Sequence, residues 1–316
     1  MNQHHTAVVA LGGNAISKPG VPDTIENQFS HTRDALRGVL ELVRRDYRLV
    51  ITHGNGPQAG NALLRVEMAR GKAPILPLGI VVADTEGGMG YMIEQCLQNV
   101  LLEAGFKRDV VSIVTQVVVD KHDSNLTNPT KFLGQFYSES EAKTLAAQSG
   151  WQMKADGNRG WRRVVGSPIP LEIINRAAIK KLVESGIIVI AAGGGGIPVH
   201  RKSDKWLEGV DAVIDKDRAS AVLGRDIGAQ ELYILTTTDK VALNFGKPNQ
   251  RDLNRMTLTE AKTFTDEGHF PPGSMGPKIE AAITFLETGG ERVVICALEN
   301  LPLALDCKAG TLIVPE

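Results

Sequence analysis

Glycine-rich turns are the segments of this chain whose residue types could do chemistry. Three of them each follow a short apolar run: Gly12-Gly13-Asn14, Gly54-Asn55-Gly56-Pro57 and the four glycines 193–196. Glycine lets backbone N–H groups approach an anion because it has no Cβ, and a following helix adds a favourable N-terminal field. Parallel strands bring their carboxyl ends to one crevice, so these turns predict a shared site for phosphate and a second small anion.

A charged triplet offers that site a cation between two carboxylates. Asp215, Lys216 and Asp217 follow an apolar run and precede a segment with helical spacing. In one interpretation they cap a helix, with Asp215 as the N-cap, Asp217 in the first turn and Lys216 in solvent. In the other interpretation the two carboxylates hold the Lys216 ammonium rigidly over a phosphoryl group. The spacing alone leaves both interpretations open.

A further lysine follows a stiff loop near the C-terminal end. Residues 268–278 contain three prolines and three glycines and lead into a segment with helical spacing. Met275 and Pro277 could cover a flat ring, and Lys278 could reach phosphate oxygens. A bland surface loop would not need this stiffness immediately before a lysine.

Two common nucleotide-binding motifs do not fit the spacing of the chain. Gly71-Lys72 and Gly246-Lys247 are not followed by the Ser or Thr that a Walker A loop requires. The glycines at 54, 56 and 60 have one residue too many for a dinucleotide fingerprint, and no acidic residue follows at a strand end. These observations disfavour a P-loop protein and a dehydrogenase.

Two histidines, His53 and His269, are candidate general bases. A carboxylate-type phosphoryl acceptor is already anionic at neutral pH, so its phosphorylation needs no base. We therefore interpret both histidines as structural.

Strand-length apolar runs alternate with amphipathic stretches of helix length. The alternation predicts an α/β fold with an open, mainly parallel sheet and helices on both faces. The expected strands are residues 7–11, 48–52, 110–119, 187–192, 232–236 and 292–297. The expected helices are residues 25–45, 59–70, 173–184, 218–223 and 279–286. Pro57 suits a first helical turn, where the N–H that it lacks would have no partner.

One segment interrupts this alternation. Residues 121–170 are polar, rich in Asn, Gly, Pro and Trp, and carry interleaved charges. The stretch is too long for a plain loop inside a compact domain. We expect a small protruding subdomain that forms a lid over the sheet edge, with a surface insertion of no role as the alternative.

Composition excludes several classes of protein. The 316 residues carry a formal net charge of −1, without the basic excess typical of proteins that bind nucleic acid or membrane surfaces. The three cysteines lie far apart without CxxC spacing, which indicates reduced thiols rather than disulfides or a zinc site. No apolar stretch approaches the roughly 20 residues needed to span a bilayer. We expect a cytoplasmic protein.

The ordered motifs of the chain resemble those of carbamate kinases, a group within the amino-acid kinase superfamily. The resemblance covers essentially the whole chain, and GGGGIPV, DKD and GSMGPK are its most specific blocks. The similar segments are ALGGNA (10–15), HGNGPQ (53–58), GYM (90–92), NPTK (128–131), RGWRRVV (159–165), GGGGIPV (193–199), GVDAVIDKD (209–217), NFGKP (244–248) and GSMGPK (273–278).

The resemblance implies an amino-acid kinase-like α/β sandwich, a homodimer and reversible phosphoryl transfer between ATP and carbamate with Mg²⁺. ADP and carbamoyl phosphate are the other pair of substrates, and arginine fermentation is a pathway associated with such enzymes. Residues 1–316 would form a single domain of two lobes. Residues 1–205 would bind carbamate and the transferred phosphoryl group, with the lid at about 121–170, and residues 206–316 would bind the nucleotide.

The resemblance also implies roles for individual residues. The expected catalytic residues are Lys131, Lys216, Asp217 and Lys278. The substrate would lie against Gly12, Gly13, Asn14, Gly54, Asn55 and Gly56. The nucleotide would contact Gly194, Gly195, Asp215, Lys216, Phe245, Met275, Pro277 and Lys278. No residue is expected to ligate a metal directly.

One position favours carbamate kinase over other members of the superfamily. Those members generally have a lysine two residues before the first Gly-Gly, where this chain has Ala10. A positive charge must then come from elsewhere, and in carbamate kinases it comes from the protruding segment, here Lys131.

The chain departs from the carbamate-kinase pattern in places. Thr236–Thr238 stand where Leu-Thr is usually followed by Asp or Gly, and 156–158 replaces a more usual acidic-Asp-Ala-Gly. Asp84 and Glu86 replace Met or Glu and Gln, beside an expected turn at Gly87-Gly88. A related kinase for another small carboxylate or amino acid, and a non-catalytic nucleotide-binding paralogue, are the alternative functions.

Overall fold

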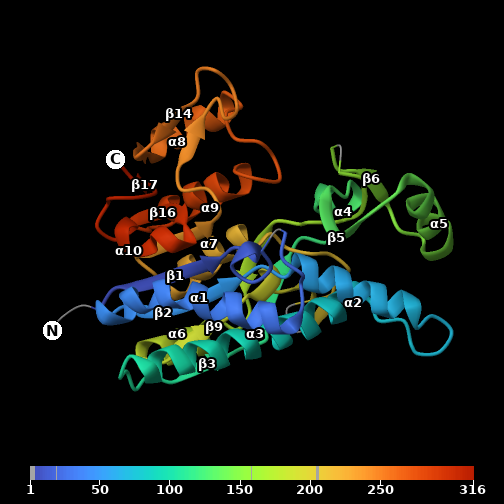
Figure 1. Ribbon diagram of the computed structural model, residues 1–316, viewed down its shortest axis with the longest axis horizontal. Coiled ribbons are helices and arrows are strands. Elements are labelled where there is room, and N and C mark those ends of the chain that lie inside the picture. Colours follow the sequence, from blue (N-terminus) through green and yellow to red (C-terminus); the bar gives the residue numbers. More distant parts are fainter. Residues whose placement is uncertain (1–3, 19, 158, 204–205) are drawn as a thin grey trace.

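An eight-stranded sheet forms the centre of the computed structural model, which describes residues 4–18, 20–157, 159–203 and 206–316 (Figure 1). Its strand order is β15-β17-β16-β12-β1-β2-β9-β3, and all neighbouring pairs are parallel except β16–β17. The strands are β1 (Thr6–Leu11), β2 (Arg48–His53), β3 (Val110–Ser112), β9 (Ile188–Ile190), β12 (Glu231–Thr236), β15 (Arg255–Thr257), β16 (Arg292–Ala297) and β17 (Thr311–Val314). This topology confirms the predicted open, mainly parallel α/β sheet.

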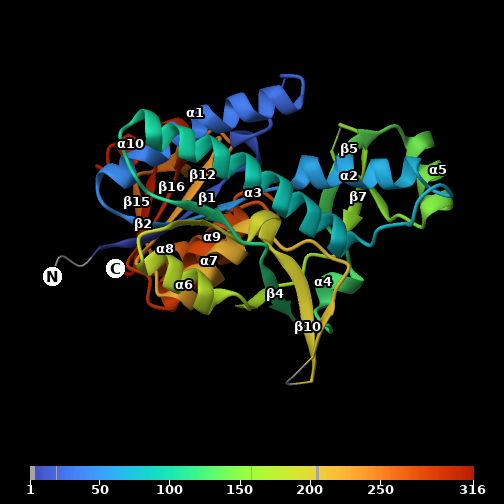
Figure 2. The same cartoon turned by 90° about the horizontal axis from the view of Figure 1, so that it is seen from below.

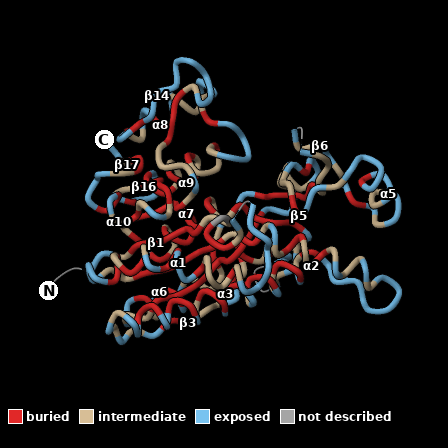
Figure 3. Tube along the Cα trace, in the orientation of Figure 1, coloured by how far each residue is buried: buried red, intermediate tan, exposed pale blue. Residues whose placement is uncertain are grey.

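Helices cover both faces of this sheet, because alternate side chains of each strand point to opposite faces. Val8 of β1 packs in one core, and its neighbour Val9 packs in the other. The first core contains α6 (Arg176–Glu184), α7 (Lys216–Ile227), α8 (Leu258–Asp266) and α9 (Gly276–Glu287). The second contains α1 (Ile25–Arg44), α3 (Leu78–Glu103) and α10 (Leu301–Ala304). Figure 2 shows the two helical layers, and Figure 3 shows the buried strands between them.

A second sheet, of four strands, lies beside the first. Its order is β11-β10-β4-β8, and its strands are β4 (Gln116–Val119), β8 (Pro170–Ile173), β10 (Ile197–Ser203) and β11 (Trp206–Gly209). A separate hairpin pairs β13 (Val241–Leu243) with β14 (Arg251–Leu253). None of the helices in the described ranges is both long enough and apolar enough to cross a membrane.

The polar segment that interrupts the alternation forms a three-stranded antiparallel sheet in the order β5-β7-β6. Its elements are α4 (Ser124–Thr127), β5 (Lys131–Tyr137), α5 (Glu139–Ser149), β6 (Met153–Ala155) and β7 (Trp161–Val165). It projects from the main sheet beside α2 (Gly56–Met68) (Figure 1). We call residues 124–165 the projecting subdomain.

The projecting subdomain touches α2 backbone against backbone. A Cβ added to Gly60 of α2 would lie 2.1 Å from the Cα of Gly134 in β5. No side chain larger than hydrogen fits at this point. Packing therefore explains Gly60, the third glycine of the 54-56-60 spacing, because only glycine leaves room there for β5.

Several predicted elements need correction. The expected strand 110–119 is two strands, because the chain leaves the main sheet after Ser112 and enters the second sheet at Gln116. The expected helix 173–184 begins only at Arg176, since Ile173 is the last residue of β8. Gly87-Gly88 is not a turn: both residues lie inside α3, a 26-residue helix that the periodicity did not indicate.

Candidate active site

Two of the predicted glycine turns meet at the carboxyl ends of neighbouring strands. Gly12 and Gly13 follow β1, and Gly54 follows β2. A Cβ added to Gly54 would lie 3.5 Å from the backbone N of Gly13 and 3.4 Å from the Cδ of Lys216. The two turns and the start of α7 are therefore in contact. Pro57 lies in the first turn of α2, as predicted.

The charged triplet serves both as a helix cap and as a buried ion pair. The Asp215 side chain caps α7, because its Oδ1 accepts from the N–H groups of Asp217 at 3.0 Å and Arg218 at 3.4 Å. The capping interpretation was wrong about Lys216, whose side chain is only 13% exposed. Its Nζ lies 2.5 Å from Asp217 Oδ1.

Three lysines from three segments meet these two aspartates. Lys278, in the first turn of α9, donates from Nζ to Asp217 Oδ2 at 2.8 Å. Lys131, the first residue of β5 in the projecting subdomain, donates from Nζ to Asp215 Oδ2 at 2.6 Å. The structure thus brings together all four residues predicted to be catalytic, with Asp215 between them. Three ammonium groups against two carboxylates leave one positive charge in excess.

Burial and charge act in opposite directions on these groups. Burial would raise the pKa of Asp217, but the Lys216 and Lys278 ammonium groups outweigh it and hold that pKa below its usual value. Burial alone would lower the pKa of Lys278, and the carboxylates of Asp217 and Asp215 raise it instead. For Lys216, burial prevails and lowers the pKa, with the neighbouring Lys278 acting in the same direction. Ion pairing therefore keeps the carboxylates charged inside a buried site.

A cavity of about 990 Å³ opens from this cluster. The predicted residues Gly12, Gly13, Lys216 and Lys278 line it. Its other wall includes His31, Asp34 and Arg37 of α1, which sequence reasoning missed. Their spacing of three residues on a helix is the signal that could have found them, since it puts all three on one face.

The remaining predicted residues lie in different surroundings. Asn55 is buried and donates to Thr85 Oγ1 at 3.0 Å, and Gly194 and Gly195 lie in the buried turn η2 (Gly193–Gly195). Phe245 is 64% exposed and lines a separate cavity of about 270 Å³ beside the β13–β14 hairpin. Met275 packs against the core formed by α7 and α9. Gly56 is the first residue of α2, and Pro277 is the second residue of α9. The Asn14 side chain lies outside the described part of the chain. Their roles toward a ligand stay predictions.

Comparison with known proteins identifies the family of this chain. The amino acid kinase family model matches residues 5–297. The chain belongs to the amino acid kinase family. Among its relatives, the carbamate kinase-like protein YahI of Escherichia coli strain K12 is 48% identical over 97% of this chain and 98% of its own length. The carbamate kinase of Pyrococcus furiosus is 45% identical over 98% of each chain.

Solved structures extend this likeness from sequence to fold. The carbamate kinase of Giardia lamblia bound to AMP-PNP has a TM-score of 0.91 to this amino acid kinase, at 40% identity over 99% of each chain. The same enzyme bound to citric acid has a TM-score of 0.93 at 39% identity. The α/β fold predicted from the sequence is therefore also the fold of these solved structures.

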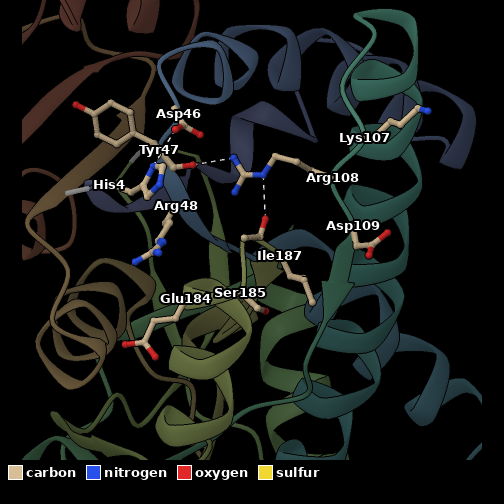
Figure 4. Close-up of a pocket in the computed structure, with 11 residues that line it drawn as sticks. His4, Asp46, Tyr47, Arg48, Lys107, Arg108, Asp109, Glu184, Ser185 and Ile187 are labelled. Carbon is tan, nitrogen blue, oxygen red and sulfur yellow. Dashed lines mark hydrogen bonds and ion pairs between the residues drawn. The ribbon is translucent and has the colours of Figure 1, made fainter. Parts of the chain in front are cut away.

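The opposite end of the sheet in this amino acid kinase also carries a cavity, of about 430 Å³ (Figure 4). It lies near the start of β2 at Arg48 and of β9, where ligands seldom bind in open α/β sheets. The Arg108 guanidinium in it donates to the carbonyl oxygens of Tyr47 at 2.7 Å and Gly186 at 2.9 Å. These contacts join two loops of the fold, and none of the described residues predicted to bind substrate or nucleotide lines this cavity.

Proposed function

We propose that this amino acid kinase is a carbamate kinase, which transfers a phosphoryl group reversibly between ATP and carbamate. The observation that carries the proposal is the Lys131–Asp215 ion pair. Ala10 is fully buried in β1, so position 10 itself offers no ammonium group to the Gly12-Gly13 turn. We infer that Lys131 supplies a positive charge from the projecting subdomain instead. Relatives at 45% and 44% identity are named carbamate kinase, which supports the proposed reaction.

In this function the chain acts by positioning and charge neutralisation. In the direction of ATP synthesis, a β-phosphate oxygen of ADP attacks the phosphorus of carbamoyl phosphate. The bond from that phosphorus to the carbamoyl oxygen breaks, and carbamate leaves as an anion. Both acceptor and leaving group are anionic, so no side chain needs to move a proton. Lys131, Lys216 and Lys278 neutralise the charge spread over the transferred group, and the amides of the glycine turns orient it.

Mg²⁺ would enter this site with the nucleotide. All four carboxylate oxygens of Asp215 and Asp217 accept hydrogen bonds from lysines or from the α7 backbone. Across the residues described, no cluster of three or more His, Cys, Asp or Glu side chains could hold a metal. The aspartates therefore suit the orientation of lysines better than metal ligation, and the nucleotide phosphates would bind the ion.

Coupled ATP formation from carbamoyl phosphate and Mg-ADP tests the proposal. We expect rapid turnover with carbamoyl phosphate and little with acetyl phosphate, the control donor. Equal turnover with both donors would contradict the assigned acceptor. No turnover with either, together with retained binding of Mg-AMP-PNP, would favour a non-catalytic nucleotide-binding paralogue.

A kinase for another small carboxylate is the second candidate. Two relatives, at 48% and 42% identity, are named carbamate kinase-like rather than carbamate kinase. The chain also carries Thr236–Thr238 at the end of β12, and Thr236 and Thr237 line the 990 Å³ cavity. Phosphorylation of a panel of small carboxylates and amino acids by Mg-ATP, with carbamate as reference, separates the two candidates.

We extend the proposal to a homodimer with two lobes, residues 1–205 for carbamate and residues 206–316 for the nucleotide. Arginine fermentation is one pathway in which such an enzyme would serve. Sedimentation equilibrium at micromolar concentration tests the assembly. A mass near twice 34.0 kDa supports the dimer, and a mass near 34.0 kDa refutes it.

A further inference from the structure

A buried glutamate on α3 holds two backbone segments that border the site. Glu86 is 2% exposed and has no role in the reaction proposed above. Its Oε1 accepts from the N–H of Gly193 at 2.9 Å, and its Oε2 accepts from the N–H of Thr115 at 3.2 Å. Gly193 opens the glycine turn after β9, and Thr115 precedes β4. One side chain thus joins α3, the main sheet and the second sheet.

The glycine turn held by Glu86 packs directly on residues of the proposed site. A Cβ added to Gly194 would lie 2.2 Å from Asn55 Nδ2, in the turn after β2. A Cβ added to Gly195 would lie 2.3 Å from the carbonyl oxygen of Ile214, the residue before Asp215. The turn therefore sits between the acceptor side and the nucleotide side, and its position sets the spacing of the two.

Thr85, the residue before Glu86, binds the turn after β2, on which the Gly193 turn packs. Thr85 Oγ1 accepts from Asn55 Nδ2 at 3.0 Å and donates to the carbonyl oxygen of Val81. Consecutive residues of α3 thus fix the turns after β2 and after β9. His53 closes the arrangement, because a Cβ added to Gly193 would lie 2.2 Å from its Nε2 and 3.0 Å from Glu86 Cγ.

We propose that Glu86 is a positioning residue for phosphoryl transfer, which acts by holding the Gly193 turn against Asn55 and Ile214. The inference rests on the proposed kinase function for its effect on turnover. Without the carboxylate, two buried N–H groups lose their acceptors, and the turn is no longer tied to α3. Displacements of about 1 Å between reacting groups cost on the order of a hundredfold in rate.

The test compares Glu86→Ala, Glu86→Gln and Asp84→Asn. Asp84 is exposed on the same helix and two residues away, so Asp84→Asn is the matched control for a change of charge. Glutamine keeps one acceptor oxygen but places an amide donor opposite the second N–H. We expect kcat per folded enzyme to fall at least about tenfold for Glu86→Ala, less for Glu86→Gln and not for Asp84→Asn. The KM values should change less than kcat.

Hydrogen exchange of the Gly193 amide provides a readout that does not depend on the substrate. We expect faster exchange in Glu86→Ala than in the wild type, and no change in Asp84→Asn. Unchanged exchange would overturn the inference, as would a freed turn with wild-type kcat. A wild-type protein with no activity toward carbamoyl phosphate would refute the proposed function, and the exchange experiment would still test whether Glu86 holds the turn.

Discussion

At the scale of single residues, each aspartate of the site satisfies more than one group. Asp217 lies between Lys216 and Lys278, and its side chain is only 3% exposed. Asp215 caps α7 with one oxygen and binds Lys131 with the other. Removal of one partner from a buried ion pair leaves an uncompensated charge. These lysines therefore balance the buried negative charge of the site, in addition to the catalytic role that we propose for them.

Replacement of the two most buried lysines tests their assigned role. We expect Lys216→Ala or Lys278→Ala to lower kcat at least about a hundredfold, since each preorganised donor contributes roughly 3 kcal/mol to transition-state stabilisation. Circular dichroism checks that the fold is retained, and Lys262→Ala, an ion-paired surface lysine on α8, is the control. A loss of tenfold or less would remove that lysine from the catalytic set.

The buried His53 predicts a pH dependence of stability. Burial is the main cause that lowers its pKa from 6.5 to about 4, and the nearby Lys216 acts in the same direction. The pKa of His53 is lower in the folded than in the unfolded chain. Its contribution to the free energy of unfolding is therefore fully present above pH 6.5 and is lost as the pH falls toward 4. We expect this loss to reach about 3 kcal/mol in the free energy of unfolding.

Urea denaturation at several pH values measures this contribution. The difference between wild type and His53→Gln isolates His53 from the other titrating groups. We expect that difference to shrink steadily between pH 6.5 and pH 4. A difference that is constant over this range would show that His53 titrates alike in both states.

At the scale of elements, the contact of β5 with α2 determines where Lys131 lies. Gly134 of β5 meets Gly60 of α2 only three residues after Lys131. The contact is between backbones, so even a methyl group on Gly60 must push the strand away. The position of the Lys131 ammonium, which we propose to be catalytic, thus depends on the absence of a side chain on a neighbouring helix.

Gly60→Ala tests this dependence. We expect Gly60→Ala to lower kcat about tenfold or more, because the Lys131 ammonium moves from its place beside Asp215. Gly71→Ala is not a suitable control, since Gly71 has φ of +79°. An alanine would fit at Gly56 of the same helix, since nothing lies within 4 Å of an added Cβ, but Gly56 belongs to the predicted substrate turn. Arg65→Ala, at an exposed position of α2, is therefore the control, and equal activity of Gly60→Ala and this control would exclude the proposed displacement.

Helices and strands could be predicted from the sequence where a clear local pattern of apolar and polar residues marks them. Strands 7–11 and 292–297 were predicted to within one residue because each is a short apolar run between polar segments. Residues 110–119 are rich in valine on both sides of the break and contain no glycine or proline, so no turn signal marks the passage from one sheet to the other between Ser112 and Gln116. α3 was missed because apolar residues such as Ile80, Tyr91 and Leu102 also stand on its exposed face, and because it contains four glycines. Its environment is set by tertiary packing.

The site divides in the same way. Lys131, Lys216, Asp217 and Lys278 stand in motifs that could be recognised, and the structure brings them together. Glu86 was noted only as a departure from a pattern, because its two partners are backbone amides 29 and 107 residues away in sequence. The α1 wall of the cavity was missed although its spacing was visible, since the helix was predicted without the surface that it faces.

At the scale of the whole molecule, a nucleotide that binds between segments of the folded chain should stabilise it. At a Mg-AMP-PNP concentration of 100 times Kd, linkage predicts about 2.7 kcal/mol of added stability. For a chain of this size that corresponds to a rise of at least about 4 °C in Tm. Differential scanning calorimetry measures the shift, and we expect Lys278→Ala to reduce it strongly. A shift of equal size in the variant would place the nucleotide away from Lys278.

Two ion pairs of the site connect residues that are remote in sequence: Lys131 and Asp215 are 84 positions apart, and Asp217 and Lys278 are 61 positions apart. During synthesis, the two aspartates emerge well before Lys278 does. Until α9 has been made and has packed on α7, the buried Asp217 carboxylate lacks its Lys278 partner. Catalytic activity therefore reports the completion of folding. A truncated chain would be inactive even if most of its sheet had formed, and recovered activity should be the last signal to appear during refolding.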